Sequence, residues 1–321
     1  MISKPKILII RLSSIGDIVL TTPVIRAISQ QLDVEVHFLS KPAFFRVLVH
    51  NPYIDVLHSY EDRESLKEID FEAVIDLHHN LKTYFLKRTL KGKHSSFFKL
   101  NIEKWLLTTF KINLLPNKHI VDRYLEAAAF LGVKNDGKGL DYFIPPDTKL
   151  PPLYSELKNN AYIAFVIGGQ HATKILPAHK VIEVLSKIPF PFVLVGGPED
   201  KQRGEEIIAS LDRGINACGS LSLDQSALLA KNARLVITND TGMMHISAAF
   251  SKDIISVWGN TAPAFGMHPY LAKEGSTMVE NANLWCRPCS KIGYKKCPLG
   301  HFKCMNDIDT NEIALLCEKS F

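Results

Sequence analysis

Apolar runs of strand length alternate with stretches of helical spacing along the whole chain. Residues 15–31 have helical spacing, and Pro23 should begin a new helical segment or kink this one. This alternation is typical of parallel sheets with crossover helices, so it predicts an α/β fold. The predicted strands are residues 6–11, 34–39, 73–77, 161–167, 192–195, 235–238 and 254–258.

A proline-rich stretch divides the pattern into two halves. Four of the seventeen prolines lie within residues 145–152, and the strand–helix alternation restarts after them. A chain of 321 residues is also long enough for two domains. We therefore predict one α/β domain over residues 1–150 and another over 151–321, with a cleft between them where ligands bind.

Composition places the chain among globular proteins. Hydrophobic residues make up 46% and charged residues 22% of the sequence. The apolar run near the N-terminus is too short for a signal peptide, and no run reaches the length of a bilayer-spanning helix. We therefore expect a cytoplasmic protein.

Cysteine usage raises the question of a metal site. Four of the six cysteines lie within 19 residues near the C-terminus, which favours reduced thiols or a local metal or redox site over a disulfide scaffold. With His301 nearby, their spacing would also suit zinc in a tetrahedral site. The four are Cys286, Cys289, Cys297 and Cys304.

Positive charge is concentrated in one segment. The formal net charge is +5, yet residues 82–118 carry nine Lys or Arg against a single acid, Glu103. Two interpretations remain open, a solvated face and a surface that docks on an anionic membrane. We expect no nucleic-acid partner, because no nucleic-acid motif or stacking platform accompanies the segment.

In open α/β sheets ligands gather at the carboxyl ends of strands, so the residues that follow each strand are candidates. The first strand ends in Arg11, and Gly16 and Asp17 follow at a helix start. Taken alone, this stretch indicates helix capping by the carboxylate. It lacks the G-x-G-x-x-G spacing of a dinucleotide site.

Three strand ends in the second half offer groups for a phosphorylated ligand. Thr173 and Lys174 follow a Gly-Gly loop, Glu199 follows a second glycine turn, and Asp240-Thr241-Gly242 leads directly into a helix. Backbone N–H groups, a hydroxyl and an ammonium would suit a diphosphate, with His245 one turn further on. For the loop with Thr173 and Lys174 the alternative is a solvated loop, and for the turn with Glu199 it is an ordinary strand–helix turn.

Five sequence elements together resemble the ADP-heptose:lipopolysaccharide heptosyltransferases of glycosyltransferase family 9. They are IIRLSSIGDIVLTTP at residues 9–23, HIVDRY at 119–124, TKILP at 173–177, DTGMMH at 240–245 and the cysteine-rich tail at 286–305. The resemblance implies a GT-B fold, in which two Rossmann-like domains face a cleft, with the acceptor on the N-terminal side. It also implies an inverting, metal-independent transfer of heptose from ADP-heptose to the inner core of lipopolysaccharide, with no cofactor.

The resemblance further assigns residue roles. Asp17 corresponds to the general base, and Arg11 to a cation that helps to hold the donor. Glu199 corresponds to a ribose contact. The remaining matches to ADP-heptose-binding positions are Thr173, Lys174, Asp240, Thr241, Gly242 and His245. The cysteines are part of the resemblance, which implies no metal for them.

Two other functions remain open from the sequence. Sugar-nucleotide 2-epimerases also place two Rossmann-like domains around a cleft, and a non-catalytic protein would bind a nucleotide sugar through the same phosphate-binding groups. The expected partners are the ADP-heptose donor, the lipopolysaccharide acceptor and, through the basic segment, the anionic inner membrane.

Overall fold

The computed structural model describes residues 4–154 and 157–321, and it divides the chain into two compact units. Unit 1 comprises Met1–Leu100 and Lys118–Phe143, and unit 2 comprises Asn101–Asn117 and Ile144–Phe321. This division differs from the sequence boundary at 150/151 mainly because unit 2 also takes a segment from the middle of unit 1. The basic segment at 82–118 is thereby shared between the units.

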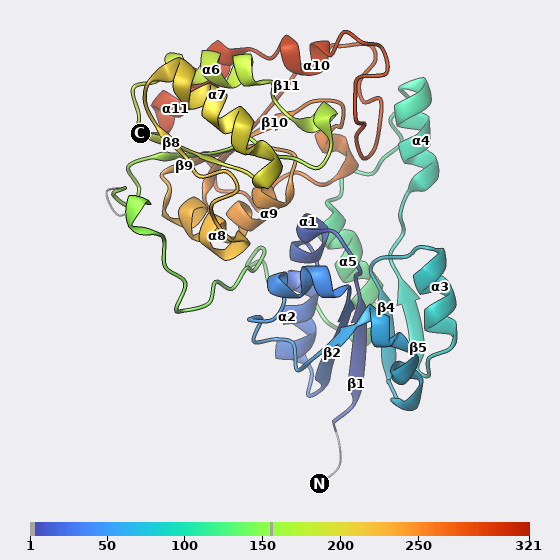
Figure 1. Ribbon diagram of the computed structural model, residues 1–321. Coiled ribbons are helices and arrows are strands. Elements are labelled where there is room, and N and C mark those ends of the chain that lie inside the picture. The colour runs from blue at the N-terminus through green and yellow to red at the C-terminus, as the bar shows by residue number, and fades with distance from the viewer. Residues whose placement is uncertain (1–3, 155–156) are drawn as a thin grey trace. The chain divides into compact units, whose positions relative to one another are not determined.

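Unit 1 contains a parallel sheet of five strands in the order β3-β2-β1-β4-β5 (Figure 1). After its first residue, Lys6, the central strand β1 is apolar and buried, as expected for a parallel strand with neighbours on both sides. The bounds are β1 Lys6–Ile10, β2 Glu35–Ser40, β3 Val56–Ser59, β4 Ala73–Asp76 and β5 Lys93–Ser96.

Unit 2 contains a parallel sheet of six strands in the order β11-β10-β9-β6-β7-β8. Its core is formed by apolar side chains of the central strands and of the helices beside them, among them Phe165, Leu194 and Val257. The bounds are β6 Ile163–Val166, β7 Phe192–Val195, β8 Ile215–Asn216, β9 Leu235–Asn239, β10 Asp253–Trp258 and β11 Thr277–Glu280.

Helices connect the strands of both units. None of the helices that the structure describes is long and apolar enough to cross a membrane. Their bounds are α1 Ile15–Val19, α2 Thr22–Gln31, α3 Leu81–Arg88, α4 Asn101–Phe110, α5 Ile120–Ala128, α6 Ala178–Ser186, α7 Lys201–Leu211, α8 Leu223–Asn232, α9 Gly242–Ala249, α10 Lys303–Asn306 and α11 Thr310–Ser320.

The α/β prediction is confirmed, and so is the new helical segment expected at Pro23, which lies in the first turn of α2. All seven predicted strands are present within one or two residues. The sequence missed β3, β5, β8 and β11, which are the edge strands of the two sheets. These strands are short or partly exposed, so they carry no continuous apolar run.

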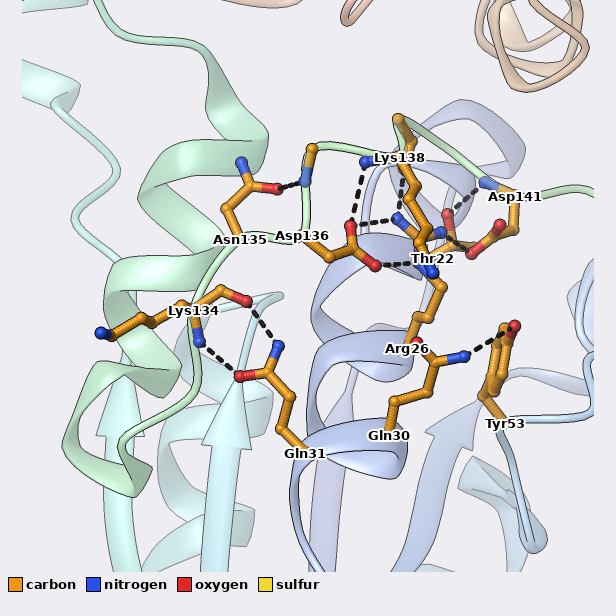
Figure 2. A network of polar contacts seen from close by, with 12 residues as sticks. Thr22, Arg26, Gln30, Gln31, Tyr53, Lys134, Asn135, Asp136, Lys138 and Asp141 are labelled. Carbon is orange, nitrogen blue, oxygen red and sulfur yellow. Dashed lines mark hydrogen bonds and ion pairs between the residues drawn. The ribbon is translucent and has the colours of Figure 1, made fainter.

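One buried arginine ties the last part of unit 1 to α2. Arg26 is 2% exposed, and its guanidinium binds both carboxylate oxygens of Asp136, the carboxylate of Asp141 and the carbonyl of Gly139 (Figure 2). Gln31 adds an exposed bond to the carbonyl of Lys134, 2.7 Å long. This network fixes residues 134–141 against the helix that follows the candidate base.

Arg26→Met is expected to destabilise unit 1 by about 3 kcal/mol, because it leaves two carboxylates beside the core without their cation. Chemical denaturation followed by circular dichroism measures the change. Gln31→Ala is the matched control, since it removes two exposed hydrogen bonds to Lys134 in the same loop and should cost about 1 kcal/mol or less. Equal effects of the two variants would contradict a special role for Arg26.

The same network predicts acid sensitivity. Hydrogen bonds from Arg26 lower the pKa of Asp136 from 3.8 to about 2, so its stabilising contribution is complete above about pH 4 and is lost as the pH falls towards 2. Burial raises the pKa of Asp141, which opposes part of this loss. Arg26→Met should therefore flatten the acid limb of the stability curve.

Candidate functional site

In unit 1 the candidate residues gather where β1 ends. Arg11 directly follows the buried strand, and its side chain is 9% exposed. Its Nη2 lies 2.7 Å from Oδ1 of Asp17, in the first turn of α1. Burial alone would lower the pKa of Arg11, but the carboxylate of Asp17 and its other neighbours raise it above the usual value. Arg11 therefore stays charged and forms a partly buried ion pair with the candidate base.

The second oxygen of Asp17 is held by the helix start. Oδ2 accepts hydrogen bonds from the backbone N–H of Ser14, at 3.2 Å, and from the Ser14 hydroxyl, at 2.8 Å. The capping role indicated by the sequence is thus confirmed. Together, Arg11 and Ser14 hold the carboxylate in one orientation at the carboxyl end of β1. Its role as the general base stays a prediction.

Arg11 makes its other contacts within unit 1. Nε donates to the carbonyl of Ser13 at 2.7 Å, and Nη1 donates to the carbonyl of Leu77 at 2.6 Å and the hydroxyl of Tyr124 at 2.8 Å. These bonds hold the guanidinium in one position, from which it orients the carboxylate of Asp17. The predicted contact of Arg11 with the donor stays a prediction.

A histidine that the sequence analysis did not single out lies at the end of the neighbouring strand β4. The buried Asp76 accepts hydrogen bonds from the N–H groups of His78 and His79, at 3.0 and 2.7 Å, which shapes this strand end. Burial, together with the charge of Arg11, lowers the pKa of His78 to about 4. His78 is therefore a neutral imidazole at neutral pH.

In unit 2 the candidate cation and acid meet directly. Nζ of Lys174, at the end of the short helical turn Ala172–Lys174, lies 2.6 Å from Oδ2 of Asp240, which follows β9. The hydroxyl of Thr261 donates to the same carboxylate oxygen at 2.9 Å. Both charged side chains are mostly buried, with exposures of 17% and 10%. Asp240 thus positions the ammonium beside the start of α9.

The last residue of β9 holds the glycine loop in place. The side-chain nitrogen of Asn239 donates to the carbonyl of Gly168 at 3.1 Å, while its oxygen accepts the N–H of Leu176 at 3.1 Å. A Cβ on Gly169 would lie 3.0 Å from Ile175 and 3.6 Å from Thr241. The loop therefore passes close to the start of α9, which brings the predicted phosphate-binding groups together.

The start of α9 has the features expected of an anion site. Thr241 is the N-cap in an extended conformation, Gly242 is the first helical residue, and His245 is 97% buried one turn further on. The hydroxyl of Thr241 lies 3.3 Å from that of Thr238. Backbone N–H groups at such a helix start favour a bound anion.

Thr173 is placed differently from its neighbour Lys174. It is 2% exposed, and its hydroxyl accepts the N–H of Tyr294 at 2.8 Å. Its own N–H donates to the carbonyl of Tyr294 at 3.2 Å. These bonds join the Thr173–Lys174 turn to the cysteine-rich segment. The predicted contact of the Thr173 side chain with the donor stays a prediction.

Glu199 is exposed in the turn after β7, beside Gly197. The neighbouring Asp200 is 3% exposed; it accepts the N–H of Gly197 at 2.9 Å and forms an ion pair with Arg203. Asp200 therefore shapes the turn, and Glu199 is the carboxylate that faces solvent. Its predicted contact with a ribose stays a prediction.

The four clustered cysteines line one cavity together with His301. The Sγ of Cys286 lies 3.8 Å from Nε2 of His301, and burial raises the pKa of Cys304 to about 12, so this thiol is protonated at neutral pH. Among the residues that the structure describes, no three His, Cys, Asp or Glu side chains form a group able to hold a metal ion. The tetrahedral zinc site that the cysteine spacing would suit is thus not formed among these residues, and metal analysis of the purified protein tests whether zinc binds.

Several partners of these candidates had signals that the sequence analysis did not use. His78 and Asn239 each directly follow a predicted strand, so the rule that located Asp240 applies to them too. Tyr124 lies within a quoted motif, although its bond to Arg11 spans 113 residues of sequence. Thr261 and Tyr294 lie in irregular segments and had no signal.

Comparisons with known proteins agree with the fold. A model of glycosyltransferase family 9 (heptosyltransferase) matches residues 61–300. Lipopolysaccharide heptosyltransferase 1 of Campylobacter coli is 27% identical over 288 residues, covering 80% of this chain and 84% of the relative. Lipooligosaccharide heptosyltransferase 2 of Haemophilus influenzae is 26% identical over 278 residues, covering 80% and 78%.

Solved structures show the same architecture. A glycosyl transferase family 9 structure from Veillonella parvula has a TM-score of 0.80 and 21% identity, covering 100% of this chain and 98% of that one. The E. coli heptosyltransferase WaaC with ADP has a TM-score of 0.72 and 19% identity, covering 98% and 100%. The GT-B prediction is therefore confirmed. Because the family model matches most of its length, the chain belongs to glycosyltransferase family 9, the heptosyltransferases.

Proposed function

We propose that this heptosyltransferase moves heptose from ADP-heptose to the inner core of lipopolysaccharide with inversion at the anomeric carbon, and that it needs no metal ion. The observation that carries the donor half is the group at the ends of β6 and β9. There Lys174, Asp240 and Thr241 converge on the start of α9. The names of the curated relatives support lipopolysaccharide as the acceptor.

The reaction divides between the two units. In unit 1, Asp17 takes the proton of the attacking acceptor hydroxyl as its oxygen bonds to the anomeric carbon. In unit 2, the bond from that carbon to the diphosphate breaks and ADP leaves. The carboxylate is a weak base, so we expect proton transfer to be late and the sugar to carry oxocarbenium character.

Charge that develops on the leaving diphosphate needs stabilisation. Lys174 supplies a full positive charge, while Thr241 and the N–H groups at Gly242 supply dipoles that are already oriented. His245 lies on the same helix one turn away. These groups provide a physical route to leaving-group departure from the protein alone.

The proposed function is tested by incubating the protein with ADP-heptose and lipopolysaccharide acceptors truncated at successive core positions. We expect the mass of one acceptor to rise by one heptose and ADP to be released in equal amount. Turnover of the sugar nucleotide without acceptor would instead favour an epimerase. ADP binding without transfer to any core acceptor would favour a non-catalytic binding protein.

A further inference from the structure

Two exposed apolar segments of unit 2 meet although they lie far apart in the sequence. The first is residues 101–117, which contains α4, and the second is the irregular stretch 281–302 between β11 and α10. Nζ of Lys111 donates to the carbonyl of Pro288 at 2.9 Å, a bond that spans 177 residues. Figure 1 shows α4 beside this stretch of the chain. The two segments therefore meet within unit 2.

Large apolar side chains project to solvent from both segments. Trp105 is 55% and Trp285 is 73% exposed, whereas the third tryptophan, Trp258, is 1% exposed. The ring of Phe110 packs edge-on against Trp105, with centroids 5.3 Å apart. We call the following residues the apolar surface: Trp105, Phe110, Ile112, Trp285, Ile292 and Leu299, each at least half exposed.

The surroundings of the apolar surface are strongly basic. The stretch 284–303 contains five Lys or Arg and no Asp or Glu. Of these, Arg287 is buried and pairs with Glu280 at 2.7 Å, while the lysines are exposed. Lys111 adds a further exposed cation where the segments meet. The lysines are Lys291, Lys295, Lys296 and Lys303.

This combination fits an anionic lipid bilayer. Tryptophan favours the boundary between headgroups and acyl chains, and the aliphatic side chains gain by burial among the acyl chains. The lysines would meet anionic headgroups at the same depth. A nucleic acid would use the cations and the aromatic rings, but it gives Ile112, Ile292 and Leu299 no apolar environment.

We propose that this part of unit 2 docks on the anionic surface of a lipid bilayer, with the apolar surface inserted at the headgroup boundary and the lysines against anionic headgroups. The biological reason for this docking rests on the proposed function, because an acceptor attached to lipid A lies at a membrane. It extends the sequence-based suggestion for residues 82–118 to a second segment that the sequence did not connect with the first.

The test measures binding of the full chain to vesicles without any donor sugar. Vesicles of phosphatidylcholine with phosphatidylglycerol are compared with vesicles of phosphatidylcholine alone, at low and high salt. We expect the anionic vesicles to bind at least about tenfold more tightly, with the advantage falling at high salt. Acyl chains labelled with bromine should quench the emission of Trp105 and Trp285, and each tryptophan is identified by replacing the other with Phe.

Variants locate the surface. Trp285→Ala and the pair Lys295→Glu with Lys296→Glu should each weaken binding about tenfold or more. The matched control is Leu315→Ala with Lys319→Glu on α11, which removes one exposed apolar group and reverses one exposed charge elsewhere in unit 2. This control should bind like the unaltered protein. Thermal unfolding confirms that each variant folds.

Three results would overturn the proposal. The first is equal binding to both vesicle types, and the second is an equal effect of the control and surface variants on vesicle binding. The third is self-association or nucleic-acid binding, in place of vesicle binding, that Trp285→Ala abolishes. The proposed transferase function is judged separately, on truncated acceptors in detergent. Vesicle binding without heptose transfer would overturn that function and leave the docking proposal standing. Heptose transfer without vesicle binding would overturn the docking proposal and leave the function standing.

Discussion

Asp17→Asn is expected to lower the turnover number for heptose transfer about a thousandfold, because an amide cannot take the proton of the acceptor hydroxyl. The affinity for ADP should not change, since the groups proposed to hold ADP belong to unit 2. The asparagine oxygen can still accept a hydrogen bond from Arg11 or Ser14, so the variant removes the base with little change of shape. Single-turnover transfer followed by mass shift, with calorimetry for ADP, measures both quantities.

Asn is a sharper replacement here than Ala. Arg11 is 8% exposed, and losing its carboxylate partner altogether would leave a buried charge without its ion pair. Ser14→Ala is the matched control, because it removes one hydrogen bond to Asp17 and keeps the carboxylate. We expect at most about a tenfold loss from it. Normal turnover by Asp17→Asn would rule out the base assignment.

Lys174→Met is expected to lower kcat/KM for ADP-heptose about a hundredfold, corresponding to about 3 kcal/mol of transition-state stabilisation. The ammonium is the one full positive charge among the groups assigned to the leaving diphosphate. Unlike a helix dipole, it cannot be replaced by a neighbouring backbone group. Its loss should reduce kcat as well as weaken ADP binding, because the charge on the diphosphate grows as the bond breaks.

Lys180→Met is the control for this variant. Lys180 lies in α6 of the same unit, is similarly buried and pairs with Glu183 at 3.0 Å, outside the proposed donor site. It should change stability slightly and leave kcat/KM within about twofold. If both variants lost transfer equally, Lys174 would have only a structural role.

The sequence was sufficient for the architecture because central parallel strands are apolar on both faces. Runs such as β1 and β7 can be recognised without knowing their neighbours. Edge strands such as β5, with the sequence KHSS, carry no comparable pattern and depend on pairing with the sheet. Their existence is decided by tertiary contacts, which local patterning does not contain.

The candidate site was predictable to the level of individual side chains but not of their partners. Strand ends and the family resemblance located Asp17, Lys174 and Asp240. That Arg11 would bind Asp17 and Tyr124 depends on side-chain directions around a folded strand end. Likewise, the burial of Thr173 against Tyr294 joins two irregular segments. Contacts of this kind have no periodic signal along the chain.

The placement of residues 101–117 in unit 2 has a consequence for synthesis on the ribosome. The chain leaves unit 1 after Leu100 and re-enters it at Lys118, but most of unit 2 begins only at Ile144. When α4 emerges, Pro288, the partner of Lys111, has not yet been translated. Unit 1 must therefore fold while residues 101–117, which interrupt its sequence, still lack their contacts in unit 2. Until those contacts form, the tryptophan and isoleucines of this segment stay exposed. No single cut of the chain yields two complete folding units, and a truncated N-terminal fragment carries this apolar segment as a point of aggregation.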